Sequence, residues 1–175
     1  MYPQEYIDYL VHFHGDRDYF ECHEVLEEYW KKVDNKNKES ILVGFILLAV
    51  SNYHHRRNNF TGAKRTLKKA LAIFIKQSDE LTSFGFTPNV FINFIKGRLD
   101  YVENHKKYKS INLPLEDSSL IRICEQLCST KGLIWCDESN LSDDQLIHKH
   151  IKRDRSEVML ERKIAINARK NKGRE

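Results

Sequence analysis

The segment Ile41–Val50 constrains the fold of this chain more than any other. It is apolar at every position apart from Gly44. A helix that is hydrophobic all round must be covered by other helices, because any face left open would expose apolar surface to water. Small and polar residues follow one stripe, which begins at Gly44 and continues through Ser51, and this stripe would let one neighbouring helix approach closely. The sequence therefore predicts a central helix inside an all-α bundle.

The segments around this helix have the amphipathic spacing of helices that cover a core. Between Tyr19 and Val33, apolar residues recur at steps of three and four, and Asp16 or Asp18 can cap the start. The chain has only seven glycines and three prolines, too few for the frequent turns of a β-sandwich or barrel. We therefore expect an antiparallel bundle of about five helices in residues 1–108.

Residues 109–175, the C-terminal extension, are expected to form a second region. Ile111–Leu115 is interpreted as extended chain lying on the bundle, residues 120–127 as a short helix, and Leu133–Cys136 as a strand. From Leu146 the pattern predicts a long helix. Residues 149–175 contain ten Lys and Arg against four Asp and Glu, so the extension ends in a basic helix. This tail could contact nucleic acid, although a solvated helix with internal ion pairs has the same composition.

Several sequence patterns are missing, and their absence bears on where the protein is located in the cell and on which kinds of catalysis it could perform. No apolar run approaches the ~20 residues that cross a bilayer, and the N-terminal residues show neither a basic leader nor a cleavage site. The four cysteines include no C-x-x-C pair and are expected as reduced thiols. Glycine loops for phosphate, nucleophile elbows and dinucleotide motifs are also missing. We therefore expect a cytoplasmic protein with no membrane partner.

The segment His23-Glu24-Val25-Leu26-Glu27 is the strongest candidate for chemistry. His23 and Glu27 are four residues apart, so a helix places both on one flank, where an imidazole and a carboxylate can share one divalent transition-metal ion. Glu24 could then act as a general base on a bound water. A third ligand would come from another helix, and His54 follows the apolar run at a suitable end. This pattern permits a metal site with a bound water.

The same residues also permit a reading without a metal. His23 and Glu27 can pair with each other, or with Arg56 or Arg57, as a buried polar brace between helices. In this case the bundle would be a non-catalytic interaction module whose groove or tail binds a protein partner. A homodimer is a second expectation, because helix faces rich in aromatic residues would leave an apolar patch uncovered. The aromatic residues of these faces are Tyr2, Tyr6, Phe13, Phe91 and Phe94.

Two blocks of sequence carry a resemblance to a known family. YFECHEVLEEYWK (Tyr19–Lys31) and GFILLAVSNYHHRRNNFTGAKRTL (Gly44–Leu67) strongly resemble domain-of-unknown-function family three hundred and nine, an all-helical bacterial and archaeal family. Its members are often labelled predicted metal-dependent hydrolases, so the resemblance implies metal-assisted hydrolysis. It covers residues 6–104. The family's signature positions fall on His23, Glu24, Glu27, Trp30, Tyr53, His54, Arg56, Asn59, Gly62 and Ala63.

The chain departs from the family pattern at two positions. Leu47 stands where relatives commonly have a glutamine, seven residues before His54 on the same helical face, so one polar neighbour of the expected metal is missing. Asn58 replaces a usual glycine before Asn59, and both residue types accept the left-handed conformation that ends a helix. Three functions thus remain open: an interaction module, a metal-dependent hydrolase, and nucleic-acid contact through residues 149–175.

Overall fold

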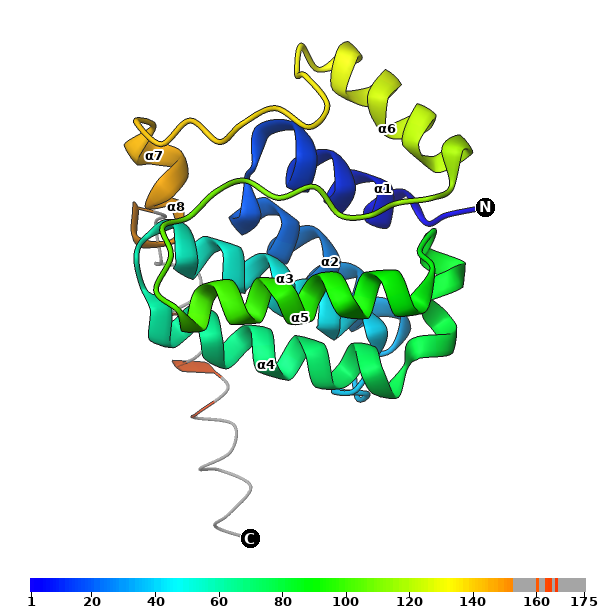
Figure 1. Cartoon of the computed structure of the whole chain (residues 1–175), viewed down its shortest axis with the longest axis horizontal. Coiled ribbons are helices and arrows are strands. Elements are labelled where there is room, and N and C mark those ends of the chain that lie inside the picture. Colours follow the sequence, from blue (N-terminus) through cyan, green and yellow to red (C-terminus); the bar gives the residue numbers. More distant parts are fainter. Residues whose placement is uncertain (153–159, 161–162, 165, 167–175) are drawn as a thin grey trace, which may run out of the picture.

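The computed structural model describes residues 1–152, 160, 163–164 and 166 of the chain. Helices pack against one another around one core, and no β-strand occurs in these residues, which confirms the all-α prediction. None of the helices found there has the length and apolarity needed to cross a membrane. The bundle consists of α1 Gln4–Val11, α2 Tyr19–Val33, α3 Ile41–Arg56, α4 Phe60–Lys76 and α5 Pro88–Glu103 (Figure 1).

Helix α3 is the central element, as its apolar sequence predicts. Phe45, Leu48 and Ala49 have no exposed surface, and the helix packs mainly against α2 and α4. A side chain at Gly44 would approach Phe74 of α4 to 2.8 Å, so glycine is required for this close packing. Ser51 Oγ donates to the Ala63 carbonyl at 2.9 Å. Both contacts confirm that the stripe of small and polar residues on α3 is the face that α4 approaches.

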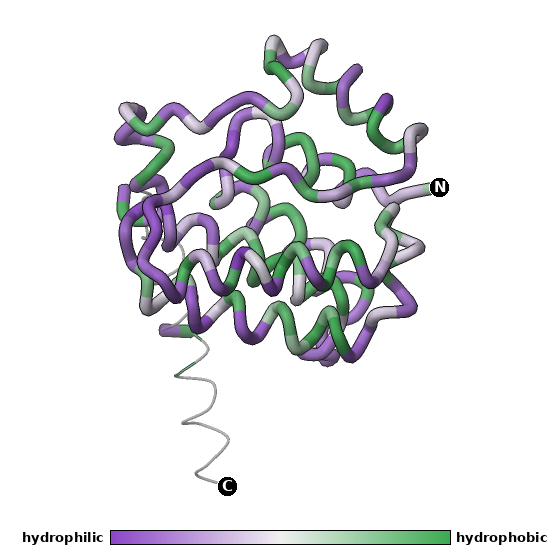
Figure 2. The backbone as a smooth tube through the Cα atoms, in the orientation of Figure 1, coloured by the Kyte–Doolittle hydropathy of each residue, from purple (hydrophilic) through white to green (hydrophobic). Residues whose placement is uncertain are grey.

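The core beside α3 is largely aromatic. Phe45 contacts the rings of six residues from α1, α4, α5 and the segment before α5. Tyr6, Phe13 and Phe91 are fully buried within the chain. These three rings therefore form no uncovered patch, whereas Tyr2 and Phe94 are only partly buried, and the homodimer stays a prediction. In Figure 2 hydrophobic residues concentrate inside the bundle, and polar residues follow its outer turns and loops.

The helix boundaries follow local signals in the sequence. A π-helical turn, His12–Asp16, continues α1 and ends at Arg17, which has a left-handed φ of 57°. Asp18 then caps α2 by accepting from the Glu21 amide at 3.0 Å. Asn58, with a φ of 58°, ends α3 in the left-handed conformation predicted for it, and a 3-10 helix, Ser78–Phe84, connects α4 to α5.

The C-terminal extension begins as chain without secondary structure, in agreement with its sequence. It runs beside α1 and leads to α6 Ser118–Thr130, which packs on α1, and a loop then returns to the N-terminal end of α2 (Figure 1). Leu133 and Ile134 have no regular structure and Trp135 and Cys136 form a turn, so the strand predicted over Leu133–Cys136 is wrong. The helix predicted from Leu146 is interrupted at His148, and the residues described between 149 and 166 are helical, so its length stays a prediction. Two short helices, α7 Asp144–Ile147 and α8 Lys149–Lys152, stand there, and most of the basic tail lies outside the described residues.

Two buried arginines attach the extension to the bundle. Arg17, only 1% exposed, donates to the carbonyls of Ile111 at 2.6 Å and Asp137 at 2.7 Å, and to Asn112 Oδ1 at 2.6 Å. Arg56 donates to the Arg17 carbonyl at 2.7 Å and to Ser139 Oγ at 3.0 Å. These bonds fix the path of the extension past α2, and they place α7 and α8 next to the candidate site.

Candidate functional site

The candidate site is the His/Glu cluster, which consists of His23, Glu24 and Glu27 on one turn of α2. One ligand atom from each residue lies within 4.8 Å of the others, and in the described part of the chain no other such group of three is found. His23 Nε2 is 3.3 Å from Glu27 Oε2, and His23 Nδ1 is 3.1 Å from Glu24 Oε1. Both ring nitrogens therefore face a carboxylate.

This arrangement has two chemical states. A protonated imidazole can donate to both glutamates at once. Alternatively, Nε2 can bind a cation together with Glu27, while Nδ1–H donates to Glu24 and holds the ring in place. The side chains of the cluster are 28% to 33% exposed, so solvent and larger molecules reach them.

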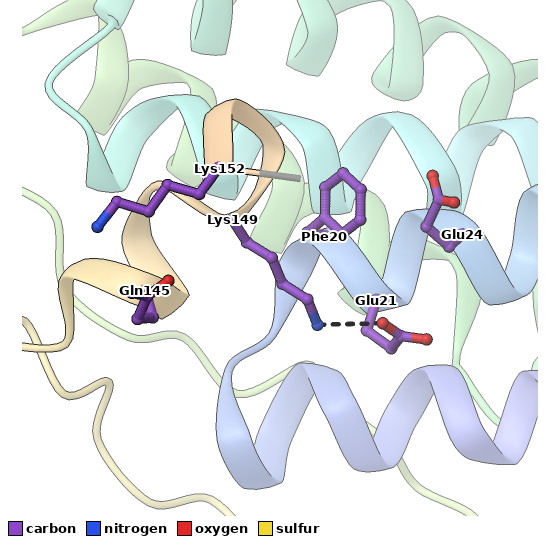
Figure 3. Close-up of a pocket in the computed structure, with 6 residues that line it drawn as sticks. All are labelled: Phe20, Glu21, Glu24, Gln145, Lys149 and Lys152. Atoms are coloured by element: carbon purple, nitrogen blue, oxygen red, sulfur yellow. Dashed lines mark hydrogen bonds and ion pairs between the residues drawn. The ribbon is translucent and has the colours of Figure 1, made fainter. Parts of the chain in front are cut away.

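An open groove of about 400 Å³ lies next to the cluster, between α2 and the α7–α8 segment (Figure 3). We call it the α2 groove. Its walls include Phe20, Glu24 and Lys149. Lys149 Nζ is 2.5 Å from Asp18 Oδ2 and 3.1 Å from Glu21 Oε2. Although burial opposes its charge, the hydrogen bonds and charges of these carboxylates raise the Lys149 pKa. Glu24 thus belongs both to the cluster and to a groove that two lysines, Lys149 and Lys152, also line.

His54, the predicted third ligand, is not in the cluster found among the described residues. Asn59 caps α4 by accepting from the Gly62 amide at 2.9 Å, which leaves Asn59 Nδ2 to donate to His54 Nδ1 at 3.1 Å. A neutral His54 then carries its proton on Nε2 and has no free lone pair for a metal. Burial, first, and nearby Arg57 lower the His54 pKa, which favours this neutral form. Metal binding by His54 stays a prediction, and it requires Asn59 to turn away.

Other signature positions have structural contacts in place of ligands. Trp30 Nε1 donates to the Asn37 carbonyl at 3.1 Å and fixes the turn between α2 and α3. The Tyr53 hydroxyl accepts from the His150 amide at 3.2 Å and so contacts α8. A side chain at Gly62 would meet Asn59 Nδ2 at 2.7 Å, so glycine is needed beside the cap of α4.

The predicted brace is present in part. His23 and Glu27 do pair, but both lie on α2 and keep about a third of their surface exposed, so the pair is not a buried contact between helices. Glu27 Oε1 also pairs with Lys31 of the same helix at 3.2 Å. Arg56 binds the extension, and Arg57 lies 5.3 Å from the centre of the Tyr53 ring. The prediction that the cluster is buried is therefore wrong.

Two buried residues that organise the site were not predicted. Arg17 and His14 both bind the start of the extension. Arg17 donates to the Ile111 carbonyl, and His14 Nε2 accepts from the Leu113 amide at 3.0 Å. Neither could be recognised from the sequence. Arginine is usually exposed and histidine is often so, and the residue type alone does not reveal the exceptional buried copy. The nearest available signal was Gly15, which ends the apolar pattern of α1 beside them.

Comparison with known proteins gives two findings. The model of a family described as "Domain of unknown function (DUF309)" matches residues 6–66, a range that includes the His/Glu cluster and the corner between α3 and α4. The chain is also 44% identical over 170 residues to "Uncharacterized protein YpuF" of Bacillus subtilis (strain 168), which covers 97% of this chain and 98% of that protein. No solved structure matches the chain.

Proposed function

The chain belongs to the DUF309 family, whose function is unknown, and we propose that it is a non-catalytic interaction module with its contact surface at the His/Glu cluster. A divalent transition-metal ion bound by His23 and Glu27 would join this surface to a partner. The observation that carries the proposal is the close approach of three ligand atoms on one half-buried helical turn.

The spacing of the two ligand atoms suits a shared ion. Zinc binds histidine nitrogen and carboxylate oxygen at about 2.0–2.2 Å, so two tetrahedral ligands stand about 3.3–3.6 Å apart. His23 Nε2 and Glu27 Oε2 are 3.3 Å apart. Glu24, 3.1 Å from Nδ1, has the position of the carboxylate that commonly orients a metal-binding histidine. In the interaction module Glu24 therefore positions His23, whereas its expected role as a general base belongs to the hydrolase and stays a prediction.

A site with two protein ligands leaves coordination positions open. A closed four-ligand site needs two more side chains, and a second copy of the chain could bring the same histidine and glutamate across a twofold axis. The exposure of the cluster leaves room for this approach. The predicted homodimer would then depend on metal, and no apolar patch is required.

A metal-dependent hydrolase is the second candidate, because Glu24 also lines the α2 groove (Figure 3). A substrate in this groove would lie next to a metal on His23 and Glu27, and an anionic group on it would compete with Asp18 and Glu21 for Lys149. The ion would polarise the substrate and supply a bound water. His54 would complete the ligand set only after its bond to Asn59 breaks.

Titration calorimetry with Zn²⁺, together with sedimentation velocity, tests the two candidates. Glu27→Gln should weaken zinc binding at least about tenfold, as loss of a ligand or its support does. Glu28→Gln is the matched control, because Glu28 lies on the same helix, pairs with Lys32 at 3.0 Å and is outside the His/Glu cluster. Equal zinc affinity in the two variants would refute the site.

The oligomeric state then separates the candidates. Zinc should convert the wild-type protein and the Glu28 variant to dimers and leave the Glu27 variant monomeric. If zinc binds and the protein stays monomeric, the interaction module fails. Metal-dependent hydrolysis of a nitrophenyl ester or phosphate, lost in Glu27→Gln and retained in Glu28→Gln, would then support the hydrolase.

A further inference from the structure

Positive charge is concentrated on one stretch of the bundle. Residues 40–77 contain seven Lys and Arg and no Asp or Glu. Lys64, Arg65, Lys68 and Lys69 all lie on the exposed side of α4, where residues three and four apart are neighbours. This surface lies on another helix than the His/Glu cluster of α2.

The basic side of α4 borders a groove of about 450 Å³ between the start of α4 and the end of α5, which we call the α4 groove. Lys64 Nζ and Lys68 Nζ both bind the same oxygen, Glu103 Oε1, at 3.1 Å and 3.0 Å. Two ammonium groups thus converge on one carboxylate oxygen. Arg65 also lines the groove, and no ion pair of its guanidinium is found in the part of the chain that the structure describes.

Glu103 marks the place where an external anion would bind. Hydrogen bonds from Lys68 and Lys64 lower its pKa, so the carboxylate is charged at neutral pH. It neutralises only one of the three cations that line the groove. An incoming phosphate could replace it between the two ammonium groups, because lysine binds phosphate as a mobile point charge.

An aromatic pair closes the end of the α4 groove. Phe60, at the first position of α4, and His105, after α5, have ring centroids 4.9 Å apart and planes inclined at 48°. Both residues line the groove, and His105 is exposed. Cationic grooves with exposed rings are typical of surfaces that bind single-stranded nucleic acid, where phosphates contact the cations and bases stack on the rings.

We propose that the α4 groove binds single-stranded nucleic acid, with phosphates on Lys64, Lys68 and Arg65 and a base on the ring pair Phe60–His105. The charges alone would also suit an acidic peptide or an anionic lipid surface. The ring pair favours a nucleic acid, because only the nucleic acid supplies a flat base at every phosphate. This proposal does not depend on metal binding at α2.

Fluorescence anisotropy of a labelled oligothymidylate with the full chain tests the proposal. Glu103→Gln should tighten binding about two- to fivefold, because it releases two cations from an exposed ion pair. Asp100→Asn is the matched control: it removes the same charge from α5 at an exposed position that does not line the groove. Equal affinity changes in the two variants would overturn the proposal, since they would show only an effect of net charge.

A second pair of measurements identifies the contacts. Arg65→Gln should reduce the slope of log affinity against log salt by about 0.7, the value for one phosphate contact of a single strand. Phe60→Leu should weaken binding of oligothymidylate and leave binding of an abasic phosphodiester oligomer unchanged. A slope unaffected by Arg65→Gln refutes the groove.

Two further outcomes would also overturn the proposal. If neutralising Lys170 and Lys172 abolishes binding and Arg65→Gln has no effect, the tail is the contact. If phosphatidylglycerol vesicles bind with the same dependence on Glu103 and Phe60, and oligothymidylate does not, the surface serves a membrane.

Discussion

Acid should destabilise this protein through His14, a residue with no exposed surface. Its Nδ1–H donates to the Leu10 carbonyl, and its Nε2 accepts from the Leu113 amide, both at 3.0 Å. The ring also lies 4.4 Å from that of Trp135. Burial is the main reason that the His14 pKa is lowered to about 3, and the charge of Arg17 acts in the same direction. The folded protein thus needs His14 neutral.

The sign and size of the effect follow from proton linkage. In the unfolded chain a histidine takes up its proton near pH 6.5, whereas the folded chain resists protonation until the pH approaches 3. The unfolded state binds more protons in this window, so stability is full above the unfolded pKa and falls as the pH decreases. Between pH 7 and pH 5 this one group should cost about 2 kcal/mol of unfolding free energy.

Urea unfolding of the wild-type protein and of His14→Gln at several pH values measures this cost. Glutamine keeps a donor and an acceptor and does not titrate, so the other ionisable groups contribute equally to both proteins. The wild-type protein should lose about 2 kcal/mol more than the variant between pH 7 and pH 5. Parallel losses in the two proteins would show that His14 is not held neutral, and the reasoning from its burial would fail.

Further predictions concern the packing that positions the site. Arg17→Met should cost about 3 kcal/mol or more of unfolding free energy in urea, because it leaves buried acceptors such as the Ile111 carbonyl without donors. A loss below about 1 kcal/mol would show that Arg17 does not hold the extension on the bundle. Gly62→Ala should lower thermal stability by about 1–3 kcal/mol, since its Cβ would lie 2.7 Å from Asn59 Nδ2. Gly97→Ala in α5 is its control, because nothing lies within 4 Å of the added Cβ, and it should stabilise the protein by up to about 1 kcal/mol. Equal effects of the two alanines would refute the argument from close packing.

The bundle could be predicted because each helix carries its own periodic signal. The continuous apolar segment of α3 requires cover on all sides, and the seam of α2 and the cap at Asp18 are local features. Asn58 was predictable for the same reason, since the left-handed position is a property of single residues. The division of the chain at residue 108 stays a prediction.

The extension was less predictable because its position depends on single distant contacts. Leu133–Cys136 is a short apolar run, for which periodicity does not separate strand from turn. The position of this segment depends on the next residue, Asp137, whose carbonyl accepts a hydrogen bond from Arg17, 120 residues earlier in the sequence. For His54, the sequence supplied the residue type but not its tautomer, which depends on the bond from Asn59.

The signature positions of the family divide into two groups by what they contact. Trp30, Asn59 and Gly62 make contacts that the bundle needs at its turns and helix caps. His23 and Glu27 contact each other on an exposed flank, and a pair four residues apart on a helix contributes only about 0.3–0.5 kcal/mol. Folding therefore gives little reason for this pair. A role in binding a ligand outside the bundle accounts for it better, and this argument supports both functions proposed for the cluster.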